Sequence, residues 1–215
     1  YEQKMILVLN IGLKNARVIA FDFNGCVNSD ISLPVMTSIR NDCIEQSPDH
    51  WIQLTEILLK ETIQKLKGKV EDIKYITITT SASCLVAIDK NGKPLCNSLL
   101  VSDSRSIIQC NTIQKNINHR NIKITPDLMI PKILWIKENW PKVYNNTYKF
   151  LNISDYLALY ITGEIITDPN NASKFLFDLK TNKYPESLFN IIGIDKEKLP
   201  KVYKIGQLIK KIRPS

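Results

Sequence analysis

The sequence lacks both the long hydrophobic runs of a membrane protein and the paired cysteines of a secreted one. Its apolar runs, such as residues 5–9, are far shorter than the roughly 20 residues that span a bilayer. The five cysteines are scattered, odd in number and nowhere spaced as C-x-x-C, which favours reduced thiols in the cytoplasm over a disulfide framework. The only two histidines do not lie at ligand spacing, so we expect no zinc site.

The composition is that of a globular protein rather than a disordered or fibrous one. The chain has 215 residues, of which 44% are hydrophobic and 23% charged, and it contains no internal repeat or low-complexity linker. This length allows one domain or two small ones. The net charge of +8 invites a nucleic-acid hypothesis, but the excess is mostly lysine spread along the chain. Scattered lysine is typical of a solvated surface, and we expect no nucleic-acid partner.

The opening stretch, residues 7–27, has the pattern of a β-hairpin that binds an anion. An apolar strand leads to a polar turn containing Gly12, and a second strand follows over residues 18–23. Two strands joined by a glycine-containing turn can direct backbone N–H groups at a phosphate. Asn10, at the end of the first strand, is placed to reach a metal ion.

Strand and helix signals alternate along the rest of the chain. Ser47 and Pro48 predict a helix over residues 48–66, whose inward face carries Trp51, Leu54, Ile57, Leu58 and Leu66. Alternation predicts strands at 72–80, at 84–89 and 95–101 around a turn at 90–93, at 149–152 and at 175–179. Further helices are predicted within 104–117, at 131–139, from 141, at 155–161 capped by Ser154, at 185–192 and at 196–199, with loops at 31–38 and 168–171. The pattern indicates an α/β fold with a mixed β-sheet.

Five blocks, in order, resemble the N-terminal domain of the FGGY family of carbohydrate kinases. The first is the opening hairpin, in which Asn10-Ile11-Gly12-Leu13 and Arg17 stand where the family has D-x-G-T and a downstream arginine. The second is EQSPDHW, at residues 45–51. The other three are ITITTSASCLVAIDKNGKPLCNSLLVSDSRS, PKILWIKENWPKVY and ISDYLALYITGEIITDPNNAS. The style is closest to the xylulokinase and gluconokinase branch.

This resemblance implies a ribonuclease H-like domain of the actin and hexokinase superfold, with helices flanking a mixed sheet. Residues 1–215 would form a single N-terminal domain, in which residues 1–4 are a tag or an upstream remnant. The parent would be a cytoplasmic kinase that uses ATP and Mg²⁺ to phosphorylate a hydroxyl of a sugar or polyol, of pentulose or gluconate type. Its ATP-binding domain and its general base would lie beyond Ser215, so we expect this chain alone to be inactive. The resemblance leaves a homodimer of the full-length protein open.

The resemblance also assigns two groups of binding residues. Asn10, Gly12, Leu13 and Arg17 would meet the phosphates and hydrated Mg²⁺, without any direct metal ligand. Asn10 replaces the family's aspartate, which removes the charge that attracts a hard cation, and Leu13 replaces a threonine.

The sugar would contact Ser81, Ala82, Ser83, Asp103 and Arg105. Relatives place Met-His or Arg-Glu where this chain has Ala82-Ser83, and many place a tryptophan where it has Val101. Asp103 and Arg105 match the closing motif and either contact substrate or form an internal ion pair. The combined departures at Asn10, Leu13, Ala82 and Val101 also fit a catalytically degenerate relative that serves as a sugar-binding or regulatory module.

Overall fold

The computed structural model describes residues 4–117, 122–209 and 212. The chain forms two compact units: residues 1–37 with 47–81, and residues 38–46 with 82–215. Each unit has its own sheet and core and is described by itself. No helix in the described ranges is long and apolar enough to cross a membrane.

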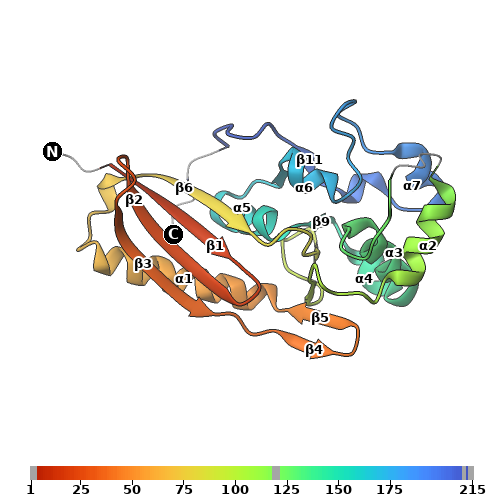
Figure 1. Ribbon diagram of the computed structural model, residues 1–215, viewed down its shortest axis with the longest axis horizontal. Coiled ribbons are helices and arrows are strands. Elements are labelled where there is room, and N and C mark those ends of the chain that lie inside the picture. The colour runs from red at the N-terminus through yellow and green to blue at the C-terminus, as the bar shows by residue number, and fades with distance from the viewer. Residues whose placement is uncertain (1–3, 118–121, 210–211, 213–215) are drawn as a thin grey trace. The chain divides into compact units, whose positions relative to one another are not determined.

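The first unit is built on a four-stranded mixed sheet with the order β3-β2-β1-β6 (Figure 1). Its strands are β1 (Met5–Ile11), β2 (Asn15–Asp22), β3 (Val27–Pro34) and β6 (Ile73–Thr80). The first three strands form an antiparallel meander, and β6 pairs parallel to β1. The predicted loop at 31–38 is wrong in its first half, because β3 continues to Pro34.

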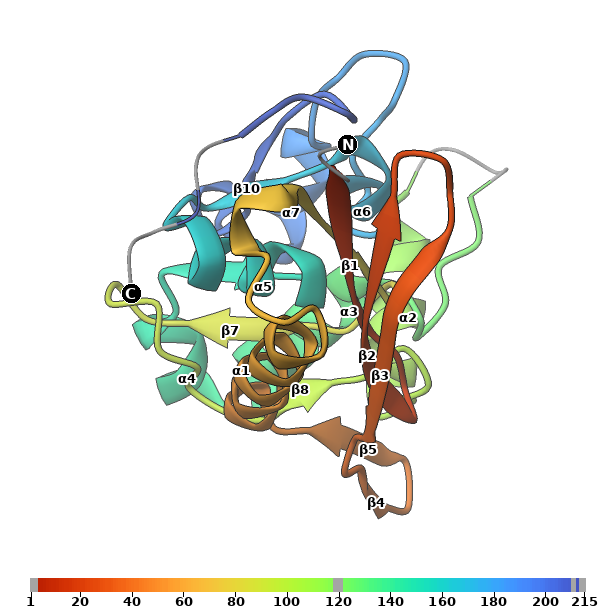
Figure 2. The same ribbon diagram turned by 90° about the vertical axis from the view of Figure 1, so that its left-hand side faces the viewer.

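Helix α1 (Pro48–Lys65) covers one face of this sheet, as Figure 2 shows. Ser47 caps it by accepting from the amide of His50 at 3.4 Å, and Pro48 occupies the first turn, which confirms the predicted start. Side chains from α1 and the strands meet in a small core that includes Leu7, Ala20 and Leu66. Ile57 was predicted on the inward face but is 45% exposed. A short 3₁₀ turn, η1 (Val70–Asp72), leads into β6.

The second unit contains three small sheets and most of the helices. Its strands are β4 (Ser38–Arg40), β5 (Cys43–Gln46), β7 (Val86–Ile88), β8 (Ser98–Leu99), β9 (Lys149–Leu151), β10 (Ile166–Thr167) and β11 (Lys201–Val202). They are grouped as β4-β5-β8, β7-β9 and β10-β11. Its helices are α2 (Ile107–Asn116), α3 (Met129–Asn139), α4 (Pro141–Asn146), α5 (Ile153–Thr162), α6 (Pro169–Ser173), α7 (Glu186–Ile192) and the 3₁₀ turn η2 (Lys196–Lys198).

Helix α3 is the centre of the second unit. It lies beside α2 and α4 (Figure 1). Its Ile130, Ile133 and Ile136 are fully buried in a core that also holds Phe150 and Phe175. An apolar helix surrounded on several sides is the arrangement that its sequence predicts.

The hairpin predicted for 84–89 and 95–101 forms in an irregular version, with antiparallel bridges Leu85–Leu99 and Ile88–Pro94 around the turn at 90–93, and β7 also pairs with β9. Two other local predictions in the second unit are wrong in detail. Residues 175–179 make only an isolated bridge, between Asp178 and Lys183. Helix α5 is capped by Asn152 instead of Ser154, and Asp155 completes a capping box with it.

Lysine side chains close the ends of several helical segments in the second unit. Lys137 donates to the carbonyls of Ile192 and Gly193 after α7, and Lys198 donates to Thr147 after α4. These carbonyls have no partner within their own helices, and a cation also complements the negative end of the helix dipole. Lys137 and Lys198 therefore stabilise the backbone of this unit.

Candidate functional site

A shallow depression lies on the sheet of the first unit, on the face opposite α1. Alternation along β1 turns Leu7 and Leu9 into the core and Asn10 to the other face. Asn10 pairs across β1 and β2 with Arg17, and Arg17 pairs across β2 and β3 with Ser32. The depression is lined by Asn10, Gly12, Leu13, Lys14, Asn15, Arg17, Asp30 and Ser32.

Gly12 makes the tight turn beside the depression feasible. Its amide donates to the carbonyl of Asn15 at 2.8 Å, which closes the turn between β1 and β2. A Cβ atom at this position would come within 3.2 Å of the same carbonyl, so a larger residue would push the two strands apart there. Leu13 follows in the turn with its side chain exposed, as the hairpin prediction requires.

Asn10 is held by a contact that an aspartate could not make. Its Nδ2 donates to the carbonyl of Thr79 on β6 at 3.3 Å. The amide therefore ties the end of β1 to β6, while Oδ1 is its only acceptor for a ligand. An uncharged oxygen attracts a hydrated cation much less strongly than a carboxylate does.

Arg17 and Asp30 form a two-point ion pair in the depression. The guanidinium donates through Nε to Asp30 Oδ1 at 2.6 Å and through Nη2 to Oδ2. Both side chains are exposed, at 46% and 37%, so the pair faces solvent. The hydrogen bond with the carboxylate raises the pKa of Arg17, and the same bond lowers the pKa of Asp30.

The predicted sugar-binding turn divides between the two units. Ser81 ends the first unit and donates its amide to the carbonyl of Ile11, whereas Ala82 and Ser83 begin the second. Ser83 is fully buried with φ +60°, a left-handed backbone that a non-glycine residue adopts at a cost. Its hydroxyl has no hydrogen-bond partner among the described residues.

A network of side-chain amides fixes the residue after this turn. The amide of Cys84 donates to Asn152 Oδ1 at 3.2 Å, and Asn152 Nδ2 donates to Asn171 at 2.9 Å. Asn171 in turn donates to Asp168 at 2.7 Å. Asp168 also caps α6 by accepting from the amides of residues 170 and 171, so the loop predicted at 168–171 is instead the start of a short helix.

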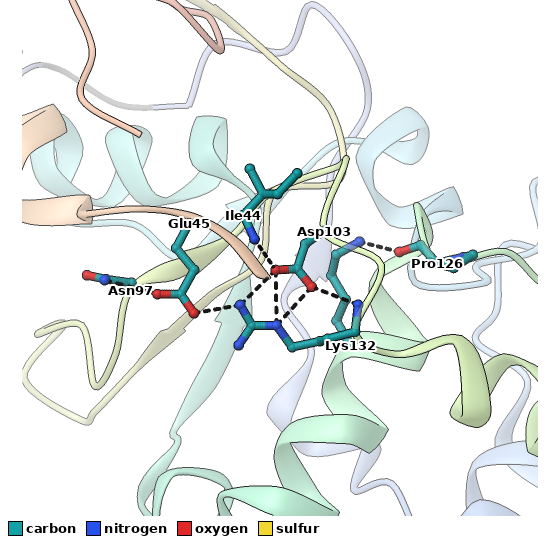
Figure 3. A network of polar contacts seen from close by, with 7 residues as sticks. Ile44, Glu45, Asn97, Asp103, Pro126 and Lys132 are labelled. Carbon is teal, nitrogen blue, oxygen red and sulfur yellow. Dashed lines mark hydrogen bonds and ion pairs between the residues drawn. The ribbon is translucent and has the colours of Figure 1, made fainter. Parts of the chain in front are cut away.

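Asp103 and Arg105 meet in a buried ion-pair network of the second unit. Arg105 donates to Asp103 at 2.7 Å and to Glu45 at 2.6 Å, and Asp103 also accepts from the amide of Ile44 at 2.7 Å (Figure 3). The side chains of Arg105 and Asp103 are 5% and 0% exposed. Burial acts to lower the pKa of Arg105, but its bonds to the two carboxylates outweigh burial and the net pKa is raised.

Two tryptophans cover the guanidinium of Arg105. Its Cζ lies 4.9 Å from the ring centroid of Trp135 and 5.5 Å from that of Trp140, and the two rings meet edge to face. Cation–π contacts of this kind hold an arginine side chain in place. With two carboxylates and two rings around it, Arg105 is placed to support the structure more directly than to bind a sugar.

Lys132 is a fully buried cation on α3 that the sequence analysis did not select. Its ammonium group donates to the carbonyl of Pro126 (Figure 3). Burial lowers the pKa of Lys132 to about 8, with Asp103 the strongest of the charges that oppose this shift. A buried lysine is rarely found unpaired, and here it joins the segment before α3 to the helix itself.

The depression fits a phosphate better than a metal ion. It contains two cationic side chains, Lys14 and Arg17, and its one carboxylate, Asp30, is already paired. Nowhere in the described ranges do three or more histidine, cysteine, aspartate or glutamate side chains gather as metal ligands. The depression thus offers its positive charge to an anion such as a phosphate.

Comparison with known proteins identifies the family to which the chain belongs. The sequence model of the N-terminal domain of the FGGY family of carbohydrate kinases matches residues 5–215. The chain belongs to the FGGY family. It is 30% identical to a xylulose kinase of Lactococcus lactis over 164 residues, which cover 74% of this chain and 33% of the relative.

Solved structures of FGGY relatives share the fold. A xylulose kinase from Rhodospirillum rubrum superposes with a TM-score of 0.90 at 20% identity, over 98% of this chain and 45% of the other. A gluconate kinase from Lactobacillus acidophilus gives a TM-score of 0.86 at 24% identity, over 98% and 44%. The mixed-sheet α/β fold of the actin and hexokinase type is thereby confirmed. The chain spans less than half the length of these relatives.

Each unit brings together a different part of the site expected for the FGGY family. Asn10, Gly12, Leu13 and Arg17 share the depression of the first unit, and Asp103 and Arg105 are bonded in the second. Asp30 was missed by sequence analysis. The alternation of polar and apolar residues from Asp30 to Leu33 is the signal that could have placed it on a strand beside Arg17.

Proposed function

We propose that this chain is the sugar-binding N-terminal half of a cytoplasmic, ATP-dependent carbohydrate kinase that phosphorylates a hydroxyl of a pentulose or an aldonate. The observation that carries the proposal is the depression beside the Gly12 turn, where Lys14 in the turn and Arg17 on β2 face solvent. Membership of the FGGY family and relatives named xylulose kinase and gluconate kinase support this choice of substrate.

In this proposal the first unit binds the phosphates of ATP and the second unit contributes to binding the sugar. Lys14 and Arg17 offer positive charge to the terminal phosphates of ATP, and the Gly12 turn lets the backbone approach them closely. Mg²⁺, when bound with ATP, would neutralise phosphate charge without a direct ligand from this chain. Ser83, whose buried hydroxyl has no hydrogen-bond partner among the described residues, is the candidate in the second unit to hydrogen-bond a substrate hydroxyl.

The test is phosphorylation by the full-length protein. Pentuloses, aldonates and polyols are each incubated with Mg·ATP, and ADP release is measured for each. We expect turnover of a pentulose or an aldonate by the full-length protein and none by residues 1–215 alone, because the general base lies beyond Ser215 in this proposal. Absence of turnover by folded, ATP-bound full-length protein would overturn the kinase assignment.

A catalytically degenerate sugar-binding module is the alternative. It is supported by Asn10, whose uncharged amide is engaged with Thr79, and by the exposed Leu13 in the phosphate turn. Binding of a sugar, measured by calorimetry, without Mg·ATP-dependent turnover would favour this alternative. A homodimer of the full-length protein remains part of the proposal, and its mass in solution by light scattering tests that separately.

A further inference from the structure

The Arg17–Asp30 pair leaves half of the arginine unused. A guanidinium has five N–H donors on a planar fork and can make bidentate contacts along two edges. Asp30 takes the edge formed by Nε and Nη2. The edge that carries Nη1 is not used by Asp30, and the side chain is 46% exposed in the depression.

Strand register explains why Asp30 can hold this position. Arg17 lies directly opposite Ser32, and Asp30 is the diagonal neighbour two residues earlier on β3, opposite Ile19. A diagonal partner is within reach of a long side chain on the same face of a sheet. Both residues belong to hydrogen-bonded strands, so the carboxylate is anchored by the sheet instead of by a loop.

We propose that Asp30 is a positioning residue, which clamps Arg17 so that its second guanidinium edge is presented to a phosphate in the depression. The proposal rests on the phosphate-binding role given to this hairpin above. Arginine otherwise loses the freedom of a rotamer-rich side chain when it binds an anion, at a cost of about 0.5–1.5 kcal/mol, or roughly two- to tenfold in affinity. Because Asp30 already fixes the Arg17 side chain in the free protein, binding of the phosphate no longer has to restrict that side chain.

The direction in which Asp30→Asn changes the affinity for an anion distinguishes a positioning role from a purely electrostatic one. Asp30 is the one carboxylate among the described residues that line the depression, so Asp30→Asn makes the depression more positive. If Asp30 acted only through its charge, its removal would strengthen the binding of an anion. If Asp30 positions Arg17, the same substitution weakens binding.

The experiment titrates the 215-residue chain with tripolyphosphate, without metal, and follows binding by calorimetry. We expect Asp30→Asn to weaken binding roughly two- to tenfold. The matched control, Glu71→Gln, removes one negative charge from the same unit outside the depression and should leave binding unchanged or slightly tighter. The ¹H–¹⁵N heteronuclear NOE of the Arg17 Nε–H group should be high in the wild type and fall in Asp30→Asn.

Each outcome bears on a different claim. Arg17→Gln should abolish tripolyphosphate binding. If the wild type binds no tripolyphosphate, the phosphate role of the hairpin fails and the positioning role fails with it. If Arg17→Gln leaves binding unchanged, Arg17 does not contact the phosphate and the positioning role fails. If Arg17→Gln abolishes binding but Asp30→Asn leaves it unchanged or tighter, the positioning role alone is overturned. Asp30→Glu keeps the carboxylate and should retain more affinity than Asp30→Asn, which guards against a variant that merely folds poorly.

Discussion

The two units hold the same chemical pair, an arginine bound to an aspartate, in opposite surroundings. Arg17 and Asp30 are 46% and 37% exposed on the first sheet, whereas Arg105 and Asp103 are 5% and 0% exposed in the second unit. An exposed pair contributes little to stability and keeps donors free for a ligand. A buried pair cannot lose one partner without leaving an uncompensated charge. Matching a sequence motif therefore does not reveal whether its arginine binds a ligand or supports the fold.

The two units also differ in net charge. The first unit is neutral, with 8 Lys and Arg against 8 Asp and Glu, whereas the second has 21 against 13 and so carries the whole excess of +8. The more basic unit is the one in which lysines cap helix ends, while the phosphate site is proposed in the neutral one. Total charge is thus a poor guide to where an anion binds in this protein.

Removing the buried arginine should have the largest effect. Arg105→Ala leaves Asp103 charged and buried, at a cost of roughly 3–5 kcal/mol, and should lower the melting temperature by about 10 °C. Arg40→Ala, at an exposed position of the same unit, is the control and should change it little. Thermal unfolding followed by circular dichroism measures both. A stable Arg105→Ala protein that has lost sugar binding would instead make Arg105 a substrate contact.

Lys132 should give the second unit a distinctive pH dependence. Its pKa is about 8 in the folded chain and about 10.4 when unfolded, so between these values the unfolded chain binds more protons and stability rises with pH. Relative to Lys132→Met, the wild type should gain up to roughly 3 kcal/mol from pH 8 to pH 10.4. The raised pKa values of Cys84 and Cys96 act in the opposite direction. The shift of Cys96 is common to both proteins, whereas the charge of Lys132 opposes the rise in the pKa of Cys84 and is lost in Lys132→Met.

Urea unfolding at several pH values, followed by tryptophan fluorescence in a Trp51→Phe background, isolates the signal of Trp135 and Trp140 in the second unit. Lys142→Met, which removes an exposed lysine of α4, is the control and should keep the wild-type pH profile. Parallel pH profiles of the wild type and Lys132→Met would contradict a buried, titrating Lys132.

The smallest effect is expected at Asn10. Asn10→Asp restores the charge found in the FGGY pattern, but it replaces a donor by an acceptor 3.3 Å from the carbonyl of Thr79. We expect a gain of a few-fold in Mg·ATP affinity of the full-length protein, because a carboxylate attracts the hydrated metal. Calorimetry with Mg·ATP and with metal-free ATP separates the two contributions. An unchanged affinity for Mg·ATP would mean that the hairpin no longer responds to the metal.

Sequence patterns within a few residues correctly predicted the helices and strands that depend only on neighbouring residues. The cap at Ser47, the helix after Pro48 and the strand at β6 follow from capping and alternation within a few residues. The β7–β9 and β10–β11 pairings join segments distant in sequence, and no local pattern encodes them. Asp30 beside Arg17 depends on the register of two strands, and the cluster around Arg105 depends on the approach of β5 and α3.

The lysine caps have a practical consequence for handling the protein. Because Lys137 and Lys198 hold helix ends, their charges cannot be removed by substitution without loosening the fold. The net charge of +8 should retain the protein on a cation exchanger at low salt. Such retention should disappear as salt is raised, and lysines that secure helix ends contribute to it.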